Sequence, residues 1–598
     1  MDDLEVEEPS TPVARARLTL APVSPSRSES GGLPRSVPAT PRLEAKDSFA
    51  DRMFSAHSEL IPVPHEPSKR FSFRTLLSYI GPGLLTSVAF VDPGNIESDL
   101  QAGAYAGYSL LWVVALSTTV GLLFQSLSAR LGTVTGKDLA TNCSEHFGGK
   151  KVVLLWCMTQ IAIIGSDIQE IVGSAVAFRL LFGLPLWAGC LLTGLDTLTF
   201  LGLHASGIRK LEAAFAMMIL TMVICFFANF FMTGPDPQKI VEGIMFPKVT
   251  RHNAIQAASI LGAVIMPHNI YLHSALVLSR DVDRTKPREI REANFYFTLE
   301  AAMALFVAFC INTAIVSVFA HGFFSPTCEK LRHPLVLKST FREPVYPPYA
   351  CVPMDHDIGM TSAQCVSMMD TPGTCQPIGL QVAGKPLETL LGSSSTILWA
   401  IGLLAAGQCS TVTGTYAGQF VMEGMLNLSL PNWQRVAITR MVALIPATIV
   451  ALIAADHYLA ADRLDEWLNV VQSVQLPFAI IPLLTCCGDK MIMGEFSLSR
   501  TEKILGWGIG GTVIIINIVL LGDHLSEEGT SVLVLAALAG VFYLWFLKQF
   551  TPSGKAAARV VAEEIGSTED ERRQLVPNRG DVEEETTNAK NAPTLQYL

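Results

Sequence analysis

Residues 81–107 read GPGLLTSVAFVDPGNIESDLQAGAYAG, an apolar stretch that is interrupted at its middle. A run of about 20 apolar residues is long enough to cross a bilayer as a helix. Pro93 lacks a backbone donor and Gly94 permits unusual dihedral angles, so the sequence predicts a helix that unwinds within the membrane. Unwound backbone is tolerated there only where it lines a protein-enclosed or watery cavity. The Asp92 carboxylate, the Asn95 amide oxygen and the freed carbonyls would then converge as hard ligands for a cation.

A second interruption lies in residues 258–280, which read ASILGAVIMPHNIYLHSALVLSR. Pro267 cannot donate to the carbonyl of Ala263, so that oxygen is free to act as a ligand. Met266 precedes this proline. Its thioether is a soft ligand that favours transition metals and has little attraction for Mg²⁺ or Ca²⁺.

Each interruption alone is also explained by an ordinary proline kink, and a single methionine by core packing. The two together carry more weight, because they fall in the first and sixth expected spans. These are corresponding positions in two five-helix halves. Paired broken helices in such positions indicate a midplane binding site in an inverted-repeat transporter.

The composition predicts an all-α polytopic membrane protein. Of the 598 residues, 50% are hydrophobic and only 16% are charged, and the charged residues are concentrated near the two ends and after residue 280. The net charge of −10 comes mostly from the tails and indicates no nucleic-acid partner. No nucleophile–base pair or nucleotide-binding motif suggests an enzyme. About twelve spans are expected, at 79–104, 109–131, 152–181, 185–204, 211–233, 254–280, 294–320, 393–425, 436–455, 465–487, 503–522 and 530–548.

The expected domain organisation is a transmembrane domain at 71–550 between two polar tails. Residues 1–70 and 551–598 are poor in residues that could form a core and are predicted to be disordered. Lys and Arg are enriched in alternate connections, which predicts that both termini are cytoplasmic. Candidate locations are the plasma membrane and an acidic endolysosomal or vacuolar membrane.

This orientation places the long loop 321–392 outside the cytosol. The loop contains four cysteines, and an even number in an extracellular or lumenal segment predicts two disulfides. Three pairings are possible from the sequence. The candidate residues are Cys328, Cys351, Cys365 and Cys375.

Five stretches resemble signatures of the NRAMP family of proton-coupled divalent metal transporters. They are DPGNIESDLQAGA from residue 92, IGSDIQEIVGSA at 164–175, MPHNIYLHSALVLSR from residue 266, GQCSTVTGTYAGQFVMEGMLNL at 407–428 and LPFAIIPLL at 476–484. The resemblance covers about 75–550, without most of loop 321–392. It implies a fold like that of the amino-acid transporter LeuT: a 5+5 inverted repeat with unwound helices 1 and 6, plus two extra helices.

The resemblance also implies a metal-binding set. Asp92, Asn95 and Met266 would bind with their side chains, and Ala89 and Ala263 with their backbone carbonyls. A polar residue of the tenth span joins the site in some conformations of related proteins. Its register indicates Asn469, with Gln472 as an alternative nearby.

Concentrating a metal requires a driving ion, and buried ionisable groups are the candidates for carrying protons. His268 adjoins the metal site, and Asp167 and Glu170 share one face of the third span. Arg440 in the ninth span needs a carboxylate partner. The resemblance implies a polar relay from Asp92 through these four residues, and the alternative is a structural ion-pair network. His273 is a further candidate, although it could equally be a packed, hydrogen-bonded histidine.

The expected function is proton-coupled symport of Mn²⁺ or Fe²⁺, and also of Co²⁺ or Cd²⁺, toward the cytosol by alternating access. Metal ions, protons and the bilayer are the expected partners, with no resident cofactor and no obligatory protein partner. One alternative is a related Mg²⁺ or Al³⁺ transporter, against which Met266 argues. Another is a metal-sensing, non-transporting relative, which should carry a large folded cytoplasmic domain. An amino-acid transporter would need small residues and free amides where Asp92 lies.

Overall fold

The structure is a computed structural model, and it describes residues 60–64, 71–205, 208–250, 253–330, 349–353, 364–426, 432–454, 458–526, 540–541, 543–545 and 548. In this part of the chain seven helices are long and apolar enough to cross a membrane. Nearly all of the two predicted tails lies outside the described residues, as does most of the predicted span 530–548. Residues 60–64 of the N-terminal tail are described and include a short strand, β1 (Ile61–Pro62).

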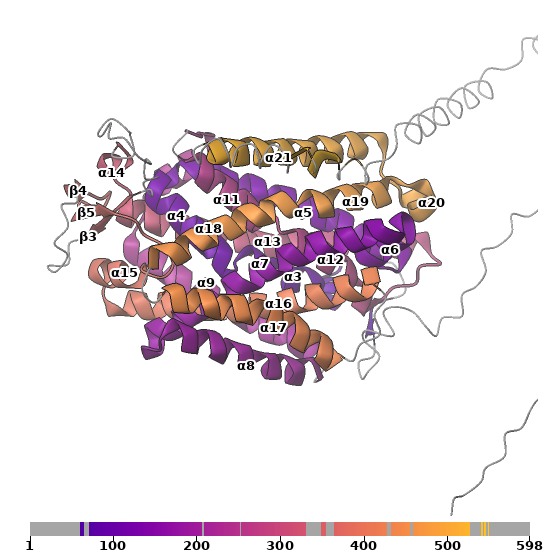
Figure 1. Ribbon diagram of the computed structural model, residues 1–598. Helices are drawn as coiled ribbons and strands as arrows, with labels where there is room; N and C mark the ends of the chain where they lie inside the picture. The colour runs from indigo at the N-terminus through magenta and orange to yellow at the C-terminus, as the bar shows by residue number, and fades with distance from the viewer. Residues whose placement is uncertain are drawn as a thin grey trace, which may run out of the picture. The chain divides into compact units, whose positions relative to one another are not determined.

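The first half of the helical bundle begins with a helix in pieces. A short helix α2 precedes it, and an interruption at residues 91–92 separates α3 and η1 from α4. Helices α3 and α4 are labelled in Figure 1. Four further long helices follow. The elements of this half are α2 (Phe73–Tyr79), α3 (Pro82–Ser87), η1 (Val88–Phe90), α4 (Pro93–Ala106), η2 (Gly107–Leu110), α5 (Leu111–Thr135), α6 (Leu139–Phe147), α7 (Gly149–Phe182), α8 (Leu186–Ala205) and α9 (Ile208–Thr233).

The second half repeats this plan, with a broken helix first and four spans after it. Helix α21 follows the second half and packs against α11 and α19. The fold is therefore the predicted LeuT-like inverted repeat with unwound first and sixth helices. The elements are α11 (Ala254–Val264), α12 (Pro267–Leu276), η3 (Val277–Ser279), β2 (Arg280–Asp281), α13 (Pro287–Phe323), α16 (Ser393–Leu426), α17 (Asn432–Ala454), α18 (Tyr458–Gln475), α19 (Pro477–Gly488), α20 (Lys490–Met493), η4 (Gly494–Phe496) and α21 (Arg500–Ser526).

The predicted span at 465–487 is present as Trp467–Gly488, and a turn at Leu476 within it divides α18 from α19. Pro477 has no amide hydrogen to give to the carbonyl four residues earlier, which is sufficient to interrupt the ladder. The total of twelve spans stays a prediction, because most of the last span lies outside the described residues.

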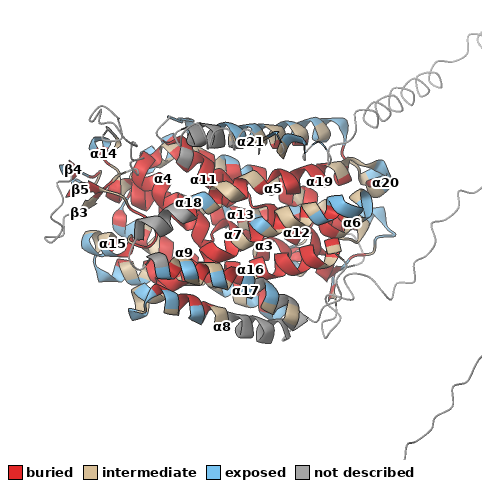
Figure 2. Cartoon of the chain, viewed as in Figure 1, coloured by how far each residue is buried: buried red, intermediate tan, exposed pale blue. Residues whose placement is uncertain are grey.

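The exposed side chains of the bundle are unusually apolar. Figure 2 shows buried residues concentrated in the central helices and exposed ones along α8, α17 and α21. Large apolar side chains are among the exposed ones, including Phe231 of α9, Phe306 of α13 and Ile504 of α21. A soluble protein does not expose so much apolar surface, whereas a bilayer solvates it. The chain is an integral, multi-pass membrane protein.

The long loop carries a small disulfide-bonded sheet that was not predicted. Its strands are β3 (Ala350–Pro353), β4 (Gln364–Val366) and β5 (Pro372–Gln376), antiparallel in the order β3-β5-β4. Two bridges are present, as predicted, and the pairing is Cys328–Cys375 and Cys351–Cys365. Because these sulfurs are bonded to one another, their close grouping is no metal site. Short helices α10 (Pro237–Met245), α14 (Pro326–Lys330) and α15 (Gly384–Leu391) complete this end of the bundle, opposite α6 and α20 in Figure 1.

Close packing of α4 on α13 depends on Gly103. A Cβ atom at this position would lie 2.3 Å from the Val316 carbonyl oxygen and 2.9 Å from the Ala320 nitrogen. Both neighbours are backbone atoms and cannot rotate away. We expect Gly103→Ala to lower the free energy of unfolding by about 1–3 kcal/mol through overpacking, measured as a lower midpoint of thermal unfolding in detergent.

The matched control is Gly511→Ala. Gly511 lies in helix α21, and no atom would come within 4 Å of an added Cβ. There the greater helix propensity of alanine should leave stability unchanged or raise it slightly. Equal midpoints for the two variants would contradict the close packing of α4 and α13.

Candidate metal site between two broken helices

The two breaks restart as helices in the same way. Asp92 is the N-cap of α4, where its side chain accepts a hydrogen bond from the Asn95 backbone N–H at 2.7 Å, and Pro93 follows at the first helical position. Asp at the cap and Pro at the first position both favour a helix start. Met266 and Pro267 occupy the equivalent positions at the start of α12, without a side-chain cap. The local sequence therefore ends one helix and begins another inside each span.

Four of the predicted ligand groups meet at one buried point. The Asn95 side-chain nitrogen lies 2.9 Å from Asp92 Oδ1, 3.0 Å from the Ala89 carbonyl oxygen and 3.1 Å from the Ala263 carbonyl oxygen. Asp92 and Asn95 are fully buried. Ala89 and Ala263 belong to helical segments that end at the breaks, so their carbonyls lack the usual intrahelical donors.

The arrangement has the donor atoms that a divalent cation needs. Asp92 Oδ2 and Asn95 Oδ1 have no hydrogen-bond partner among the described residues, although both atoms are buried. A half-turn of the Asn95 amide would exchange its nitrogen for its oxygen. The oxygens of Asp92, Asn95, Ala89 and Ala263 would then face one another around a single position suited to a cation.

The predicted sulfur ligand lies in the second break. Met266 is 1% exposed and follows Ala263 by three residues. Its sulfur is 3.9 Å from Ser166 Oγ of α7. The soft atom is thus held between the second broken helix and α7, in the same unwound segment that supplies the Ala263 carbonyl.

Asn469 lies beside the first break and outside this group of four. Its amide nitrogen donates to the Gly94 carbonyl at 3.3 Å and to Ser259 Oγ at 3.1 Å, and its oxygen accepts from Gln169 at 2.9 Å. Gln472, the alternative from the sequence, donates to Gln169 Oε1 at 2.6 Å. Both candidates therefore belong to one polar layer. Gln169 joins them and was missed, although it stands between Asp167 and Glu170 in the membrane-spanning helix α7.

The acidic pair of α7 is buried next to a glycine of α16. Asp167 and Glu170 are 1% and 2% exposed, and Ser166 Oγ donates to Glu170 Oε1 at 3.0 Å. A Cβ atom at Gly414 would lie 2.6 Å from Asp167 Oδ1, so this glycine makes room for the pair. Arg440 of α17 is buried, and its Nη1 has no hydrogen-bond partner among the described residues. Gly414 was missed, although it belongs to the stretch at 407–428.

The two histidines of α12 have different surroundings. His268 is 1% exposed, and its Nδ1 has no hydrogen-bond partner among the described residues. His273 is fully buried, and its Nδ1 lies 3.1 Å from Thr86 Oγ1 of α3. His273 therefore connects α12 of the second broken helix to α3 of the first, as expected for a packed, hydrogen-bonded histidine. Its role in proton transfer stays a prediction.

Two five-helix halves, each beginning with a helix that is broken at a buried polar segment, define a membrane transporter fold of the LeuT-like class. The family model described as "Natural resistance-associated macrophage protein-like" matches residues 83–340 and 360–523. The chain therefore belongs to the Nramp family, as the motifs indicate.

Relatives from distant organisms agree over most of the chain. The metal transporter nramp1 homolog of Dictyostelium discoideum is 45% identical over 441 residues, which are 73% of each chain. Natural resistance-associated macrophage protein 2 of Homo sapiens is 41% identical over 539 residues, 88% of this chain and 90% of the human one. A crystal structure of the Eremococcus coleocola manganese transporter, in complex with an aromatic bis-isothiourea substituted compound, matches 82% of this chain and 99% of its own. Its TM-score is 0.65 and its sequence identity 26%.

Proposed function

We propose that this protein carries Mn²⁺ or Fe²⁺ across a membrane toward the cytosol together with protons, by alternating access. The observation that carries the proposal is the meeting of Asp92, Asn95 and the Ala89 and Ala263 carbonyls at one buried point. The names of two of these proteins support the choice of cargo, because the Dictyostelium relative is named a metal transporter and the solved neighbour a manganese transporter. Co²⁺ and Cd²⁺ would meet the same ligands.

The ligand chemistry favours a transition metal over other cations. Asp92 supplies the negative charge that offsets the loss of the ion's hydration shell. Met266 supplies a sulfur that a Mg²⁺ ion does not use. A Mg²⁺ or Al³⁺ transporter is the alternative of nearest chemistry, and the presence of this thioether disfavours it. A metal-sensing relative that does not transport is a further alternative, and net uptake into vesicles would exclude it.

A proton route is supported by the way in which Ser166 joins two sites. Its hydroxyl lies 3.0 Å from Glu170 Oε1 and 3.9 Å from the Met266 sulfur, so the acidic pair begins one side chain away from the metal ligands. His268, two residues beyond Met266, offers an ionisable group on the other broken helix. When a metal binds, Asp92 would lose its proton. The polar groups proposed to form the route for this proton are His268, Asp167, Glu170 and Arg440.

The orientation is part of the same proposal. The excess of Lys and Arg in alternate connections supports cytosolic termini, and with them a disulfide-bonded sheet that faces an oxidising compartment. The plasma membrane and an acidic endolysosomal or vacuolar membrane both satisfy this arrangement. An acidic exterior would supply the proton gradient in either case.

Uptake into proteoliposomes tests the proposed coupling. We expect Mn²⁺ uptake to be severalfold faster when the outside is at pH 5.5 and the inside at pH 7.5 than at equal pH, with acidification of the lumen as metal enters. Asp167→Asn should reduce this acceleration while leaving Mn²⁺ binding in place, because Asp167 is not among the metal ligands. Uptake that ignores the gradient would remove proton coupling from the proposal and leave the metal site standing.

A further inference from the structure

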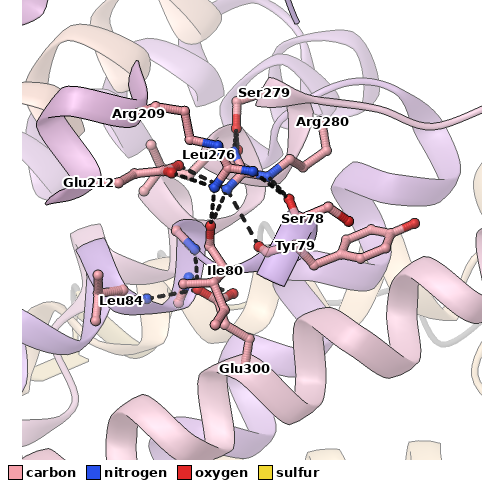
Figure 3. A network of polar contacts seen from close by, with 12 residues as sticks. Ser78, Tyr79, Ile80, Leu84, Arg209, Glu212, Leu276, Ser279, Arg280 and Glu300 are labelled. Carbon is pink, nitrogen blue, oxygen red and sulfur yellow. Dashed lines mark hydrogen bonds and ion pairs between the residues drawn. The ribbon is translucent and has the colours of Figure 1, made fainter. Parts of the chain in front are cut away.

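The end of α2, just before the first broken helix, is fastened to β2 by one arginine (Figure 3). The Arg280 side chain is fully buried, and its Nε donates to the Ser78 carbonyl at 3.0 Å. Its Nη2 donates to the Ile80 carbonyl and to Glu212 Oε1, the latter at 2.8 Å. Arg209 adds bonds to Ile80 and Glu212 from α9. The carbonyls at the end of α2 are therefore satisfied by side chains from two other parts of the chain.

The start of α3 is held from the opposite side by Glu300 of α13. The Glu300 carboxylate accepts hydrogen bonds from the backbone N–H groups of Gly81 at 2.6 Å, Gly83 at 3.0 Å and Leu84 at 3.1 Å. A carboxylate at a helix N-terminus also interacts favourably with the helix dipole. Gly81 has a φ of 148°, which a residue with a side chain rarely adopts. The joint between α2 and α3 is thus fixed on both sides.

A segment from the predicted N-terminal tail covers this joint. Strand β1 pairs in parallel with β2, with Ile61 opposite Arg280 and Pro62 opposite Asp281. The backbone of Arg280 therefore pairs with the N-terminal segment, while its side chain holds the end of α2. We call residues Leu60–Pro64 the N-terminal clasp.

The clasp is attached by apolar side chains as well as by its backbone. Ile61 is 7% exposed and Val63 is 5% exposed, whereas Pro62 and Pro64 are exposed. Val63 lies in a buried cluster with residues of α2, α13 and the segment after β2, including Tyr79, Phe297 and Val282. Leu60 packs against a second cluster, which contains Leu85 and Val88 of the first broken helix and Leu272 and Leu276 of the second.

We propose that the N-terminal clasp is an autoinhibitory contact that holds the inner side of the transporter closed. This inference rests on the proposed alternating access, in which α3 must part from α12 and α13 for an ion to leave on this side. The clasp is buried against α2, α13 and the segment around β2 together, so its contacts exist only while these parts stay joined. A contact that is made in one state alone shifts the equilibrium toward that state. Release of the clasp would therefore favour the inward-open state.

Hydrogen–deuterium exchange of the full-length protein in detergent tests the clasp directly. The amides to follow are those of residues 73–87, including the three that donate to Glu300. We expect Val63→Asp to speed their exchange about tenfold, the effect of losing the burial of one valine side chain. The matched control, Pro64→Asp, adds the same charge at an exposed neighbouring position and should change the exchange rate less than twofold. Exchange in α16 reports whether the bundle remains folded.

Two truncations provide a second comparison that does not depend on a buried charge. A chain that starts at residue 60 keeps the clasp and should exchange like the full-length protein, whereas a chain that starts at residue 65 should match Val63→Asp. If Val63→Asp and the shorter chain both exchange at the rate of the full-length protein, the proposed role of the clasp is wrong. Mn²⁺ uptake is measured separately. If the variants exchange faster but the protein takes up no Mn²⁺, the clasp is supported and the proposed transport is contradicted. If exchange is unchanged and the protein does take up Mn²⁺, the transport is supported and the clasp is contradicted.

Discussion

Replacing Asp92 by asparagine is expected to abolish Mn²⁺ uptake and to weaken Mn²⁺ binding on the order of a hundredfold, about 2.7 kcal/mol. The carboxylate is the one formal negative charge among the four convergent ligand groups, and a divalent ion in a buried site depends on it. Asparagine can still accept the hydrogen bond from the Asn95 backbone N–H, so α4 keeps its N-cap. The weaker Mn²⁺ binding should therefore result from the lost charge and not from a change in the fold.

Isothermal titration with Mn²⁺ and uptake into proteoliposomes measure the two effects. Asp138→Asn is the matched control, because Asp138 is also a fully buried N-cap aspartate, at the start of α6, and accepts from the Thr141 N–H at 2.8 Å. It should leave Mn²⁺ affinity within about threefold, since losing a remote charge costs little at an effective dielectric constant near 20. Binding by Asp92→Asn at nearly the original affinity would show that the metal is held elsewhere.

Replacing Met266 by alanine is expected to leave measurable Mn²⁺ uptake and to remove most of the discrimination against Ca²⁺. The oxygen ligands of the first break remain and bind either ion. The sulfur is the one proposed ligand that Ca²⁺ does not favour. The ratio of Mn²⁺ to Ca²⁺ uptake should fall about tenfold or more, which corresponds to about 1.4 kcal/mol of lost preference.

Competition between ⁵⁴Mn²⁺ and Ca²⁺ in the same vesicles measures this ratio. Met222→Ala is the control, because Met222 of α9 is a fully buried methionine within the apolar core. That variant loses the same side-chain volume and should be less stable, with an unchanged ratio of the two ions. A ratio that also stays unchanged in Met266→Ala would mean that the thioether only fills space.

The breaks were predictable because their causes are local. Pro93 and Pro267 interrupt a helix wherever they occur inside one, and Asp92 caps the helix that follows. The choice between Asn469 and Gln472 was not predictable. Residues three positions apart lie on the same side of a helix. The sequence therefore cannot show which of the two faces a given neighbour, because the orientation of the helix about its axis is not known. In the structure both residues reach Gln169, from α7.

The disulfide pairing and the clasp depend on contacts between distant parts of the chain. Four cysteines allow three pairings, and only the three-stranded sheet selects one of them. Residues 60–64 lie in a region whose composition resembles a disordered tail, and nothing in that composition indicates the apolar clusters that receive Leu60 and Val63. Those clusters are built from helices of both halves, which the local sequence cannot display.

An ion that binds at the proposed site must first displace the hydrogen bonds of the Asn95 amide. Its nitrogen already hydrogen-bonds to the three oxygens that would otherwise repel one another, so an arriving ion competes with an internal donor. Turning that amide away sacrifices buried hydrogen bonds, each with a net value of about 0.5–1.5 kcal/mol. A singly charged ion such as Na⁺ or K⁺, attracted half as strongly by the Asp92 carboxylate, gains less from the exchange than Mn²⁺ does. We therefore expect the proposed site to favour Mn²⁺ over the abundant monovalent ions.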